Sequence, residues 1–264
     1  MSVAILVDVT RCTGCERCTE ACVEVNRRNR VAAEVDRATT RDGLSANRWC
    51  TVVEAAEGRF ARKSCMHCLE PSCVSACLVG SLQKTAEGPV VYDPDKCIGC
   101  RYCMLACPFH VPRYEWSRVA PFMQKCDLCA ERLQGGERPA CVEACPHDVL
   151  TFGSRDELLE RARALIRDTP GRYLPHVWGE TELGGTSVLY VSDVDLAALG
   201  WPGTEAAAIP ALTEPVIEKT PLLGGAVLMG VWGLSAIIER RQRLMSSAAS
   251  SGSADRQEED EHGD

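Results

Sequence analysis

The chain has 264 residues, a hydrophobic content of 45% and a formal net charge of −8 at pH 7. This length allows one large domain or two small ones. Aromatic residues make up only 5% of the chain, so a core built mainly on Phe and Trp is not expected. The 17 cysteines are unusual for this length and leave three classes of protein: disulfide-rich, zinc-binding and iron–sulfur.

The first cysteine group lies in CTGCERCTEAC and contains Cys12, Cys15, Cys18 and Cys22. The run CIGCRYCMLACP repeats its spacing with Cys97, Cys100, Cys103 and Cys107. The pattern C-x2-C-x2-C-x3-C-P is typical of bacterial ferredoxins. In that pattern three thiolates of one tight loop bind a [4Fe–4S] cube, and the fourth, on the following helix, binds a different cube.

The segment RWCTVVEAAEGRFARKS, residues 48–64, follows the first group and alternates apolar and polar residues around an EG turn. This pattern predicts a β-hairpin. It contains Cys50, the one cysteine outside the groups of four, for which a buried apolar role is expected because free cysteine is commonly buried.

Two further groups have a wider spacing. CMHCLEPSCVSAC contains Cys65, Cys68, Cys73 and Cys77, and the pair CDLC with CVEAC contains Cys126, Cys129, Cys141 and Cys145. His67 lies inside the CMHC motif, but the thiols already fill the site, so it is not expected to be a ligand.

Disulfides and zinc explain these groups less well than clusters do. Cysteines two residues apart rarely bridge each other without strain, and the total count is odd. Zinc knuckles draw one CxxC pair from each of two segments and often include His, which is scarce here. A third cysteine after each of two CxxC pairs favours iron–sulfur cubes.

The four groups form a repeat. DVTRCTGCERCTEAC aligns without a gap with DPDKCIGCRYCMLAC, and PSCVSAC aligns with PACVEAC. A unit of two cysteine groups therefore occurs twice. Since a ferredoxin-like unit holds two clusters, the sequence predicts four clusters in an α+β fold, a duplicated bacterial-ferredoxin-like domain.

With these motifs the chain resembles the four-cluster iron–sulfur subunits of membrane-bound respiratory oxidoreductases. The stretch WGETELGGTSVLYVSDV, from Trp178, resembles the hydrogenase-2 and formate dehydrogenase branches most. The resemblance implies a nested exchange of ligands between groups. One cube is expected on Cys12, Cys15, Cys18 and Cys145; one on Cys126, Cys129, Cys141 and Cys22; one on Cys65, Cys68, Cys73 and Cys107; and one on Cys97, Cys100, Cys103 and Cys77.

Charged residues surround the cysteine groups. Together the basic residues beside the cysteines are expected to offset the negative charge of sixteen thiolates and to tune the cluster potentials, whereas each one taken singly is better explained as part of a solvated charged surface. These residues include Arg11, Arg17, Lys96, Arg101 and Lys125.

After the clusters, a capping box of Ser154 and Glu157 predicts a helix that ends at Pro170-Gly171. GTSVLYVSDV then alternates as a strand. From Leu222 to Ile238 no residue is charged, a length of roughly 25 Å as a helix, enough for a short membrane span. Ala226 and Gly230 offer a small-residue seam for a partner helix.

The expected domains are residues 1–153, the four-cluster domain of two intertwined two-cluster modules; 154–200, a helix–strand extension; 201–221, a linker; 222–238, a transmembrane helix; and 239–264, a basic and then acidic disordered tail. The basic ERRQR after the span predicts a cytoplasmic C-terminus and an extracytoplasmic cluster domain. The N-terminal residues show no export signal, so this placement requires export of the folded protein with a signal-bearing partner.

No substrate site is evident in the sequence. We therefore expect a non-catalytic subunit, not an enzyme on its own, that relays electrons through four [4Fe–4S] clusters. Its expected partners are a catalytic subunit, nickel–iron hydrogenase or alternatively a molybdopterin enzyme such as formate dehydrogenase, and an integral membrane quinone- or haem-binding subunit, with no nucleic acid. A free-standing ferredoxin-like carrier or sensor is a lesser alternative, which the membrane segment disfavours.

Overall fold

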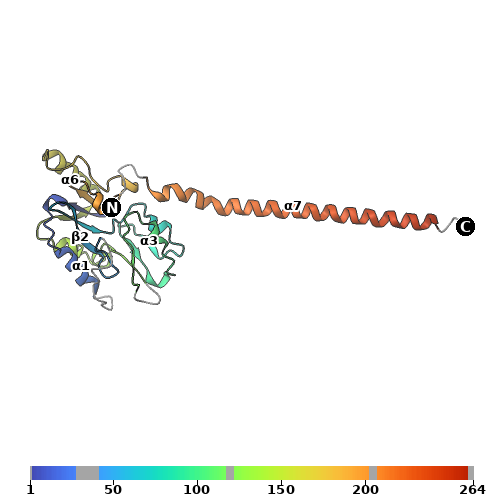
Figure 1. The fold of residues 1–264 in the computed structure, drawn as a ribbon, viewed down its shortest axis with the longest axis horizontal. Coiled ribbons are helices and arrows are strands. Elements are labelled where there is room, and N and C mark those ends of the chain that lie inside the picture. Colours follow the sequence, from blue (N-terminus) through green and yellow to red (C-terminus); the bar gives the residue numbers. More distant parts are fainter. Residues whose placement is uncertain (1, 28–41, 117–121, 202–206, 261–264) are drawn as a thin grey trace. The chain divides into compact units, whose positions relative to one another are not determined.

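The computed structural model describes residues 2–27, 42–116, 122–201 and 207–260 (Figure 1). It divides into two compact units, residues 1–211 and 212–264. The first unit combines short strands with short helices, which confirms the α+β prediction. Its strands are β1 Val3–Asp8, β2 Cys50–Ala56, β3 Arg59–Ser64, β4 Leu82–Lys84, β5 Val90–Tyr92, β6 Arg113–Tyr114, β7 Met123–Gln124, β8 Leu150–Ser154 and β9 Val188–Val191. Its helices are α1 Arg17–Arg27, α2 Ser72–Ser75, α3 Tyr102–Ala106, α4 Ala130–Gln134, α5 Ala140–Glu143 and α6 Arg155–Asp168, with 3-10 turns η1 Val9–Arg11, η2 Pro94–Lys96, η3 Glu182–Gly184 and η4 Ala197–Leu199.

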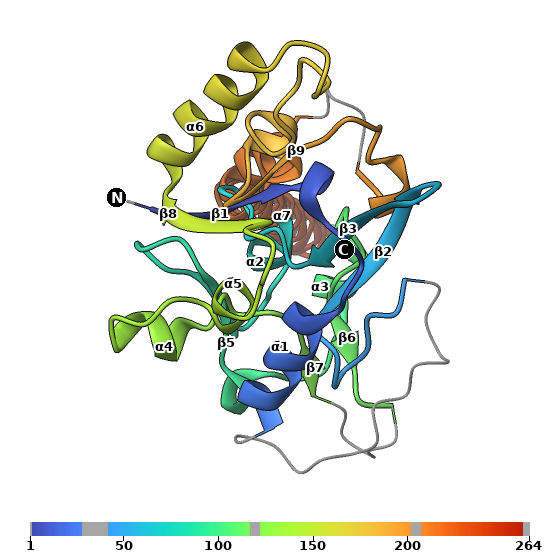
Figure 2. The same ribbon diagram turned by 90° about the vertical axis from the view of Figure 1, so that its left-hand side faces the viewer.

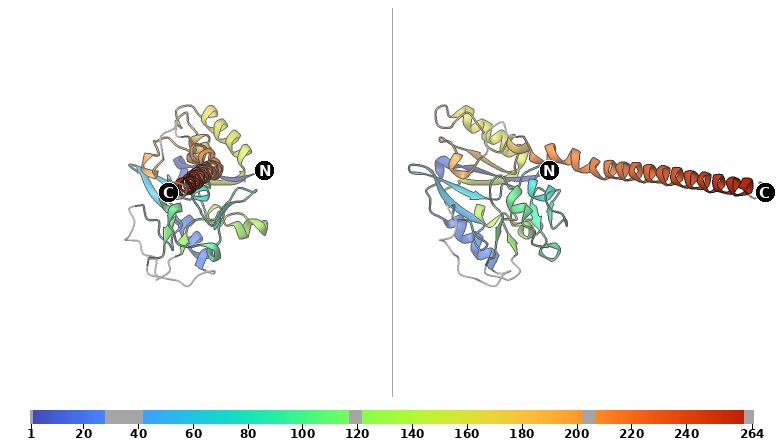
Figure 3. Two further views of the ribbon diagram at one scale, coloured as in Figure 1. Left: turned by 90° about the vertical axis from the view of Figure 1, so that its right-hand side faces the viewer. Right: turned by 45° about the vertical axis from the view of Figure 1, so that its right-hand side comes forward.

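A three-stranded sheet of order β8-β1-β9 organises this unit. Strand β1 pairs antiparallel with β8 and parallel with β9, so that Ile5 lies opposite both Phe152 and Val188. Alternate side chains of β1 face opposite sides of the sheet. Ala4 and Leu6 pack with the apolar face of α6, whereas Ile5 joins the core that contains the cysteines. Figures 2 and 3 show α6 on one side of this sheet and α1 on the other.

Three two-stranded hairpins, β2–β3, β4–β5 and β6–β7, surround the cysteine core. The predicted hairpin over residues 48–64 is confirmed: Cys50 pairs with Ser64 and Glu54 with Phe60, with a bulge before Ala56. Both strands of this hairpin are buried near the base and exposed near the turn at Gly58. The base of the hairpin therefore belongs to the core.

The internal repeat is visible in the backbone as well as in the sequence. Asp8 and Asp93 each begin a 3-10 turn, and each accepts a hydrogen bond from the backbone N–H two residues later. The loops that follow contain Gly14 at φ 74° and Gly99 at φ 70°, in the left-handed region that favours glycine. The CxxC turns of the other two groups repeat one another in the same way, with positive φ at His67 and at Leu128.

The extension after the cysteines forms the predicted helix and strand. Helix α6 begins after Ser154 and ends at Asp168, two residues before Pro170. The Ser154 side chain makes no capping hydrogen bond, so the predicted capping box is wrong. The reason is that Ser154 is still part of β8, paired with Val3, and the next backbone N–H donates to the Ser2 carbonyl.

The described residues of the second unit, 212–260, all lie in helix α7, Ile209–Asp260. It begins inside the segment expected to be a linker and includes Pro215 and Pro221, and it extends through residues expected to be a disordered tail. Ala, Leu, Glu and Arg are frequent in α7, and their helix propensity favours its extension in both directions. Between Ile209 and Met245 the helix is long and apolar enough to cross a membrane, and an 18-residue window within it has a mean hydropathy of 1.8.

Candidate metal centres

The structure gathers sixteen cysteines into four sets, and each set combines cysteines from two groups. They are the first set, Cys12, Cys15, Cys18 and Cys145; the second set, Cys22, Cys126, Cys129 and Cys141; the third set, Cys65, Cys68, Cys73 and Cys107; and the fourth set, Cys77, Cys97, Cys100 and Cys103. The family resemblance implies the same groupings as cluster ligands, and that role stays a prediction.

The first set lines a cavity of about 340 Å³, counting space open to solvent. Cys12 follows η1 directly, and Cys18 lies in the first turn of α1. Cys145 arrives from the end of α5, which packs against α1. The pairing of β1 with β8 brings these two distant parts of the chain to the same place.

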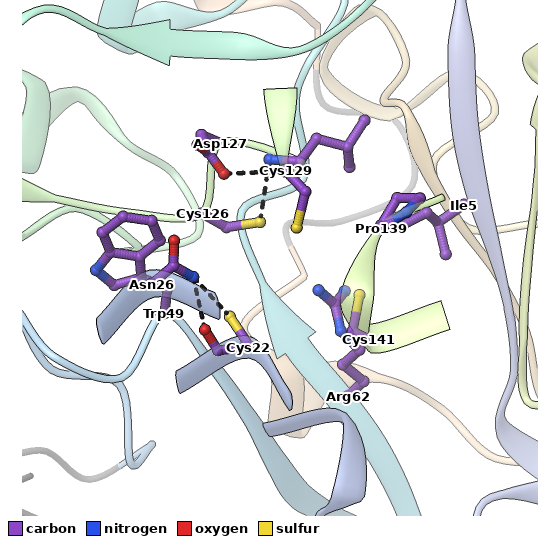
Figure 4. A pocket seen from close by; sticks show the side chains of 11 residues that line it. Ile5, Cys22, Asn26, Trp49, Arg62, Cys126, Asp127, Cys129, Pro139 and Cys141 are labelled. Atoms are coloured by element: carbon purple, nitrogen blue, oxygen red, sulfur yellow. Dashed lines mark hydrogen bonds between the residues drawn. The ribbon is translucent and has the colours of Figure 1, made fainter. Parts of the chain in front are cut away.

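The second set lines a cavity of about 300 Å³. Figure 4 shows the four sulfur atoms pointing into one shared space. Backbone and amide groups already donate to the sulfurs: Leu128 N lies 3.4 Å from Cys126 Sγ, and Asn26 Nδ2 lies 3.4 Å from Cys22 Sγ. Such donors stabilise thiolate and raise the reduction potential of a bound cluster.

The third set lines a cavity of about 360 Å³, together with the buried Lys125. The Lys125 ammonium donates to the carbonyls of Val90 and Cys126, which fixes a positive charge beside this set. Val111 N lies 3.5 Å from Cys107 Sγ. Among the basic residues expected to offset the cluster charge, Lys125 is buried, whereas Arg11, Arg17, Lys96 and Arg101 are exposed.

The fourth set is gathered where α2 packs against α3. Burial raises the pKa of Cys103, with further contributions from Cys100, Cys97 and Cys77. The Tyr114 hydroxyl lies 3.6 Å from Cys103 Sγ. Burial and the neighbouring Cys97 raise the pKa of Tyr92. Two phenols therefore face this set.

Nine of the sixteen thiols have a raised pKa, and burial is the largest cause for each of them. Burial raises the pKa of Cys73 to about 12 and those of Cys107 and Cys129 to about 11. Four thiolates in such a space require a bound cation to remain ionised, since a coordinating metal deprotonates its thiols. The donor chemistry is thus that of a metal site.

The donor set fits [4Fe–4S] cubes better than zinc. Each set is made of sulfur alone, the soft ligand that iron–sulfur clusters require. Within the described part of the chain, no three His, Cys, Asp or Glu side chains are gathered tightly enough to hold a single metal ion. A structural zinc site needs that tight tetrahedral arrangement, whereas a cube separates its four ligands.

The sets follow one another in space in the order first, second, third, fourth. The charge of Cys141 in the second set acts to raise the pKa of Cys18 in the first set. In the same way Cys65 of the third set acts on Cys126 of the second, and Cys103 of the fourth set acts on Cys73 of the third, so these sets are neighbours. The two exposed cysteines are Cys15 in the first set and Cys100 in the fourth. The four sets in this order form a row, called the file below, and the file therefore reaches the surface at both ends.

Two other residues singled out from the sequence lie close to these sets. Cys50 is fully buried, as expected, but it also contacts Cys18: their hydrogen bond lowers the pKa of Cys18 and raises that of Cys50. His67 is fully buried and its Nδ1 accepts a hydrogen bond from Val90 N at 2.9 Å. Burial lowers the pKa of His67, and the accepted hydrogen bond leaves Nδ1 engaged away from a metal.

Sequence reasoning missed Arg62. This residue of β3 is 2% exposed and lines both the first and the second cavity. Burial opposes its charge, but Cys141, Cys50, Cys126 and Cys18 raise the pKa of Arg62 overall. The one sequence signal was an arginine on the core side of a hairpin otherwise expected to bury apolar residues.

The fold and the cysteine sets define a ferredoxin-type iron–sulfur protein. A family model described as a 4Fe-4S dicluster domain matches residues 56–155. A protein of Nitratidesulfovibrio vulgaris is 40% identical over an alignment of 256 residues that covers 92% of this chain and 68% of that protein.

Two named relatives define the family further. "Hydrogenase-2 operon protein HybA" of Escherichia coli O157:H7 is 33% identical over 283 residues, covering 92% of this chain and 85% of the relative. "Formate dehydrogenase, nitrate-inducible, iron-sulfur subunit" of Escherichia coli strain K12 is 37% identical over 203 residues, covering 72% and 67%. The chain belongs to this family of iron–sulfur subunits, which includes HybA.

Proposed function

We propose that the chain is the electron-transfer subunit of an oxidoreductase complex and relays single electrons through four [4Fe–4S] clusters. The cysteine sets are the proposed ligands, one cube per set. The observation that carries the proposal is their order: four sulfur-lined sites in a file whose two ends, at Cys15 and Cys100, are exposed. A relay between two partners needs an entry and an exit of this kind.

The residues of the chain hold and shield the clusters. When bound, a [4Fe–4S] cube supplies one-electron redox chemistry. The cysteines fix each cube, backbone N–H groups such as those of Leu128 and Val111 donate to the sulfurs, and apolar side chains from the core exclude water. Burial and hydrogen bonds to sulfur help to determine the reduction potential of a bound cluster.

We propose that one end of the file meets a catalytic subunit, a nickel–iron hydrogenase, and the other an integral membrane subunit that binds quinone or haem. The similarity to HybA, which covers 85% of that relative, supports the hydrogenase. The alternative is a molybdopterin enzyme, supported by the similarity to the formate dehydrogenase iron–sulfur subunit. Mass spectrometry of proteins that copurify with the chain decides between these two partners.

We propose that α7 anchors the chain in the membrane, with its C-terminus in the cytoplasm and the cluster domain outside. The basic run after Ile238 supports this orientation. Labelling of Asp195→Cys and Ser247→Cys variants in intact cells with an impermeant thiol reagent tests it. We expect label at residue 195 and protection at residue 247; the reverse pattern would invert the orientation.

The cluster proposal is tested by metal analysis of the anaerobically purified chain. We expect about sixteen irons per chain, four per cube. Cys100→Ala should lower this to about twelve and interrupt electron transfer without loss of partner binding. Cys50→Ala is the matched control and should retain all the iron, because Cys50 lies outside the four sets. About four zinc ions per chain in place of iron would refute the proposal.

A further inference from the structure

Arg62 is a buried cation placed between two of the proposed cluster sites. Its side chain lines the cavity of the first set and also that of the second. Figure 4 shows its guanidinium beside the Cys141 side chain. The thiols that act most strongly on it are Cys141, Cys50, Cys126 and Cys18, which come from both sets and from the unassigned cysteine.

The protein itself leaves this charge without a counterion. Within the described residues, Arg62 makes no salt bridge, and its Nε and Nη1 atoms are buried with no hydrogen-bond partner. An arginine side chain does not lose its proton in proteins. A buried, unpaired cation is strongly unfavourable, so a negative group must compensate it in the loaded protein.

We propose that Arg62 is a positioning residue shared by the first and second clusters, and that its charge raises the reduction potentials of both. This inference rests on the proposed function, because it takes the clusters as the missing anions. A cube with four thiolate ligands becomes one charge more negative on reduction. A fixed cation nearby in a poorly screened interior favours that reduced state.

The placement also matters for transfer between the two clusters. An electron on either cluster lies beside the same guanidinium, so the cation stabilises both locations of the electron. Arg62 therefore raises the two potentials together, so that the electron is not held on one of the first two clusters by a large difference in potential between them. Among the three described cavities, Arg62 is the residue that lines two, whereas Lys125 lines that of the third set.

The test is an EPR-monitored redox titration of the full-length, iron-loaded chain. Arg62→Met removes the charge and keeps an apolar stem of similar length. We expect it to lower two of the four potentials, each by at least tenfold in the one-electron equilibrium, about 59 mV. The other two should change less than threefold. Arg62→Lys should restore both potentials to within threefold of wild type.

Arg59→Met is the matched control on the same strand. Arg59 is exposed and pairs with Asp193 at 2.7 Å, and its loss should leave all four potentials unchanged. If Arg62→Met carries full iron and no potential moves by threefold, or if all four move equally, the inference is wrong.

Iron content separates the remaining outcomes. If Arg62→Met and Arg62→Gln both lose iron while Arg62→Lys keeps it, the cation is required at these two sites and the inference stands. If the lysine variant loses the same iron, Arg62 acts by packing alone and the inference is overturned. A wild-type chain without iron would instead refute the proposed function.

Discussion

Gly14 and Gly99 occupy equivalent positions in the two repeats, yet their neighbours differ. Both have φ near 70°. A Cβ at residue 14 would lie 3.0 Å from the Phe60 ring, whereas nothing lies within 4 Å of one at residue 99. The duplication thus provides an internal comparison between backbone strain alone and strain combined with a steric contact.

We predict that Gly14→Ala destabilises the loaded chain more than Gly99→Ala. Each substitution places a Cβ in the left-handed region at a cost of about 1–2 kcal/mol, and only Gly14→Ala must also displace Phe60. Denaturant-dependent bleaching of the cluster absorbance, measured anaerobically, compares the two variants. Equal losses would mean that the Phe60 contact has no energetic weight.

At this scale the sequence indicates the cysteine groups but not the side chains that surround them. Spacing identified the cysteine groups because each loop of three thiols is local in the chain. Arg62 could not be identified in the same way, since its importance depends on how β3 packs between groups far apart in sequence. The same is true of Tyr92 and Tyr114, which come from two different hairpins.

At the scale of elements, Asp42 connects two hairpins. Its carboxylate lies 3.0 Å from Lys63 Nζ on β3 and 3.0 Å from Arg113 Nη2 on β6. Burial alone raises the pKa of Asp42, but the hydrogen bond and charge of Lys63, with Arg113, hold it below its usual value. The group therefore contributes stability above its unfolded pKa and loses this contribution as the pH falls through the folded one.

We predict that Asp42→Asn lowers the free energy of unfolding by about 1–2 kcal/mol. Because the pKa of Asp42 is depressed, the difference from wild type should be the same at pH 6 and pH 8. Anaerobic thermal bleaching at both pH values measures it. Asp95→Asn, at an exposed carboxylate, is the control and should have little effect; a difference that disappears by pH 6 would contradict the assignment.

Helix α7 allows a second prediction for an element. Leu228 lies near the middle of the uncharged segment 222–238. Leu228→Arg should disfavour membrane insertion by about 2.5–3.5 kcal/mol, and Leu228→Ile should not. Carbonate extraction of membranes compares the two; full retention of the arginine variant in the membrane fraction would argue against a spanning helix.

The boundaries of α7 differ from those predicted from the sequence. Pro215 and Pro221 lie in the segment 201–221, which the sequence predicts to be a linker, and each removes a backbone donor, but the helix continues through both. The Ser154 cap failed for a related reason: strand pairing used the backbone groups first. In both places a local signal competed with neighbouring structure and lost.

At the scale of the whole molecule, the proposed relay makes the interior sites indispensable for transfer, because every electron must pass through them. We predict that Cys126→Ala, in the second set, abolishes quinone reduction by the assembled complex but leaves the dye-linked activity of its catalytic subunit. Cys50→Ala should retain both activities. Parallel assays with dye and quinone measure this, and substantial quinone reduction by Cys126→Ala would show that electrons bypass the second site.

The nested membership of the sets has a consequence for biosynthesis. The fourth and third sets are complete once the ribosome has passed residues 103 and 107, whereas the second waits for Cys141 and the first for Cys145. The half of the file that holds the fourth and third sets is therefore finished before the half that holds the second and first, although the first set begins nearest the start of the chain. A nascent polypeptide shorter than 145 residues lacks the last ligand of the first set, so this site can be loaded only after translation has reached Cys145.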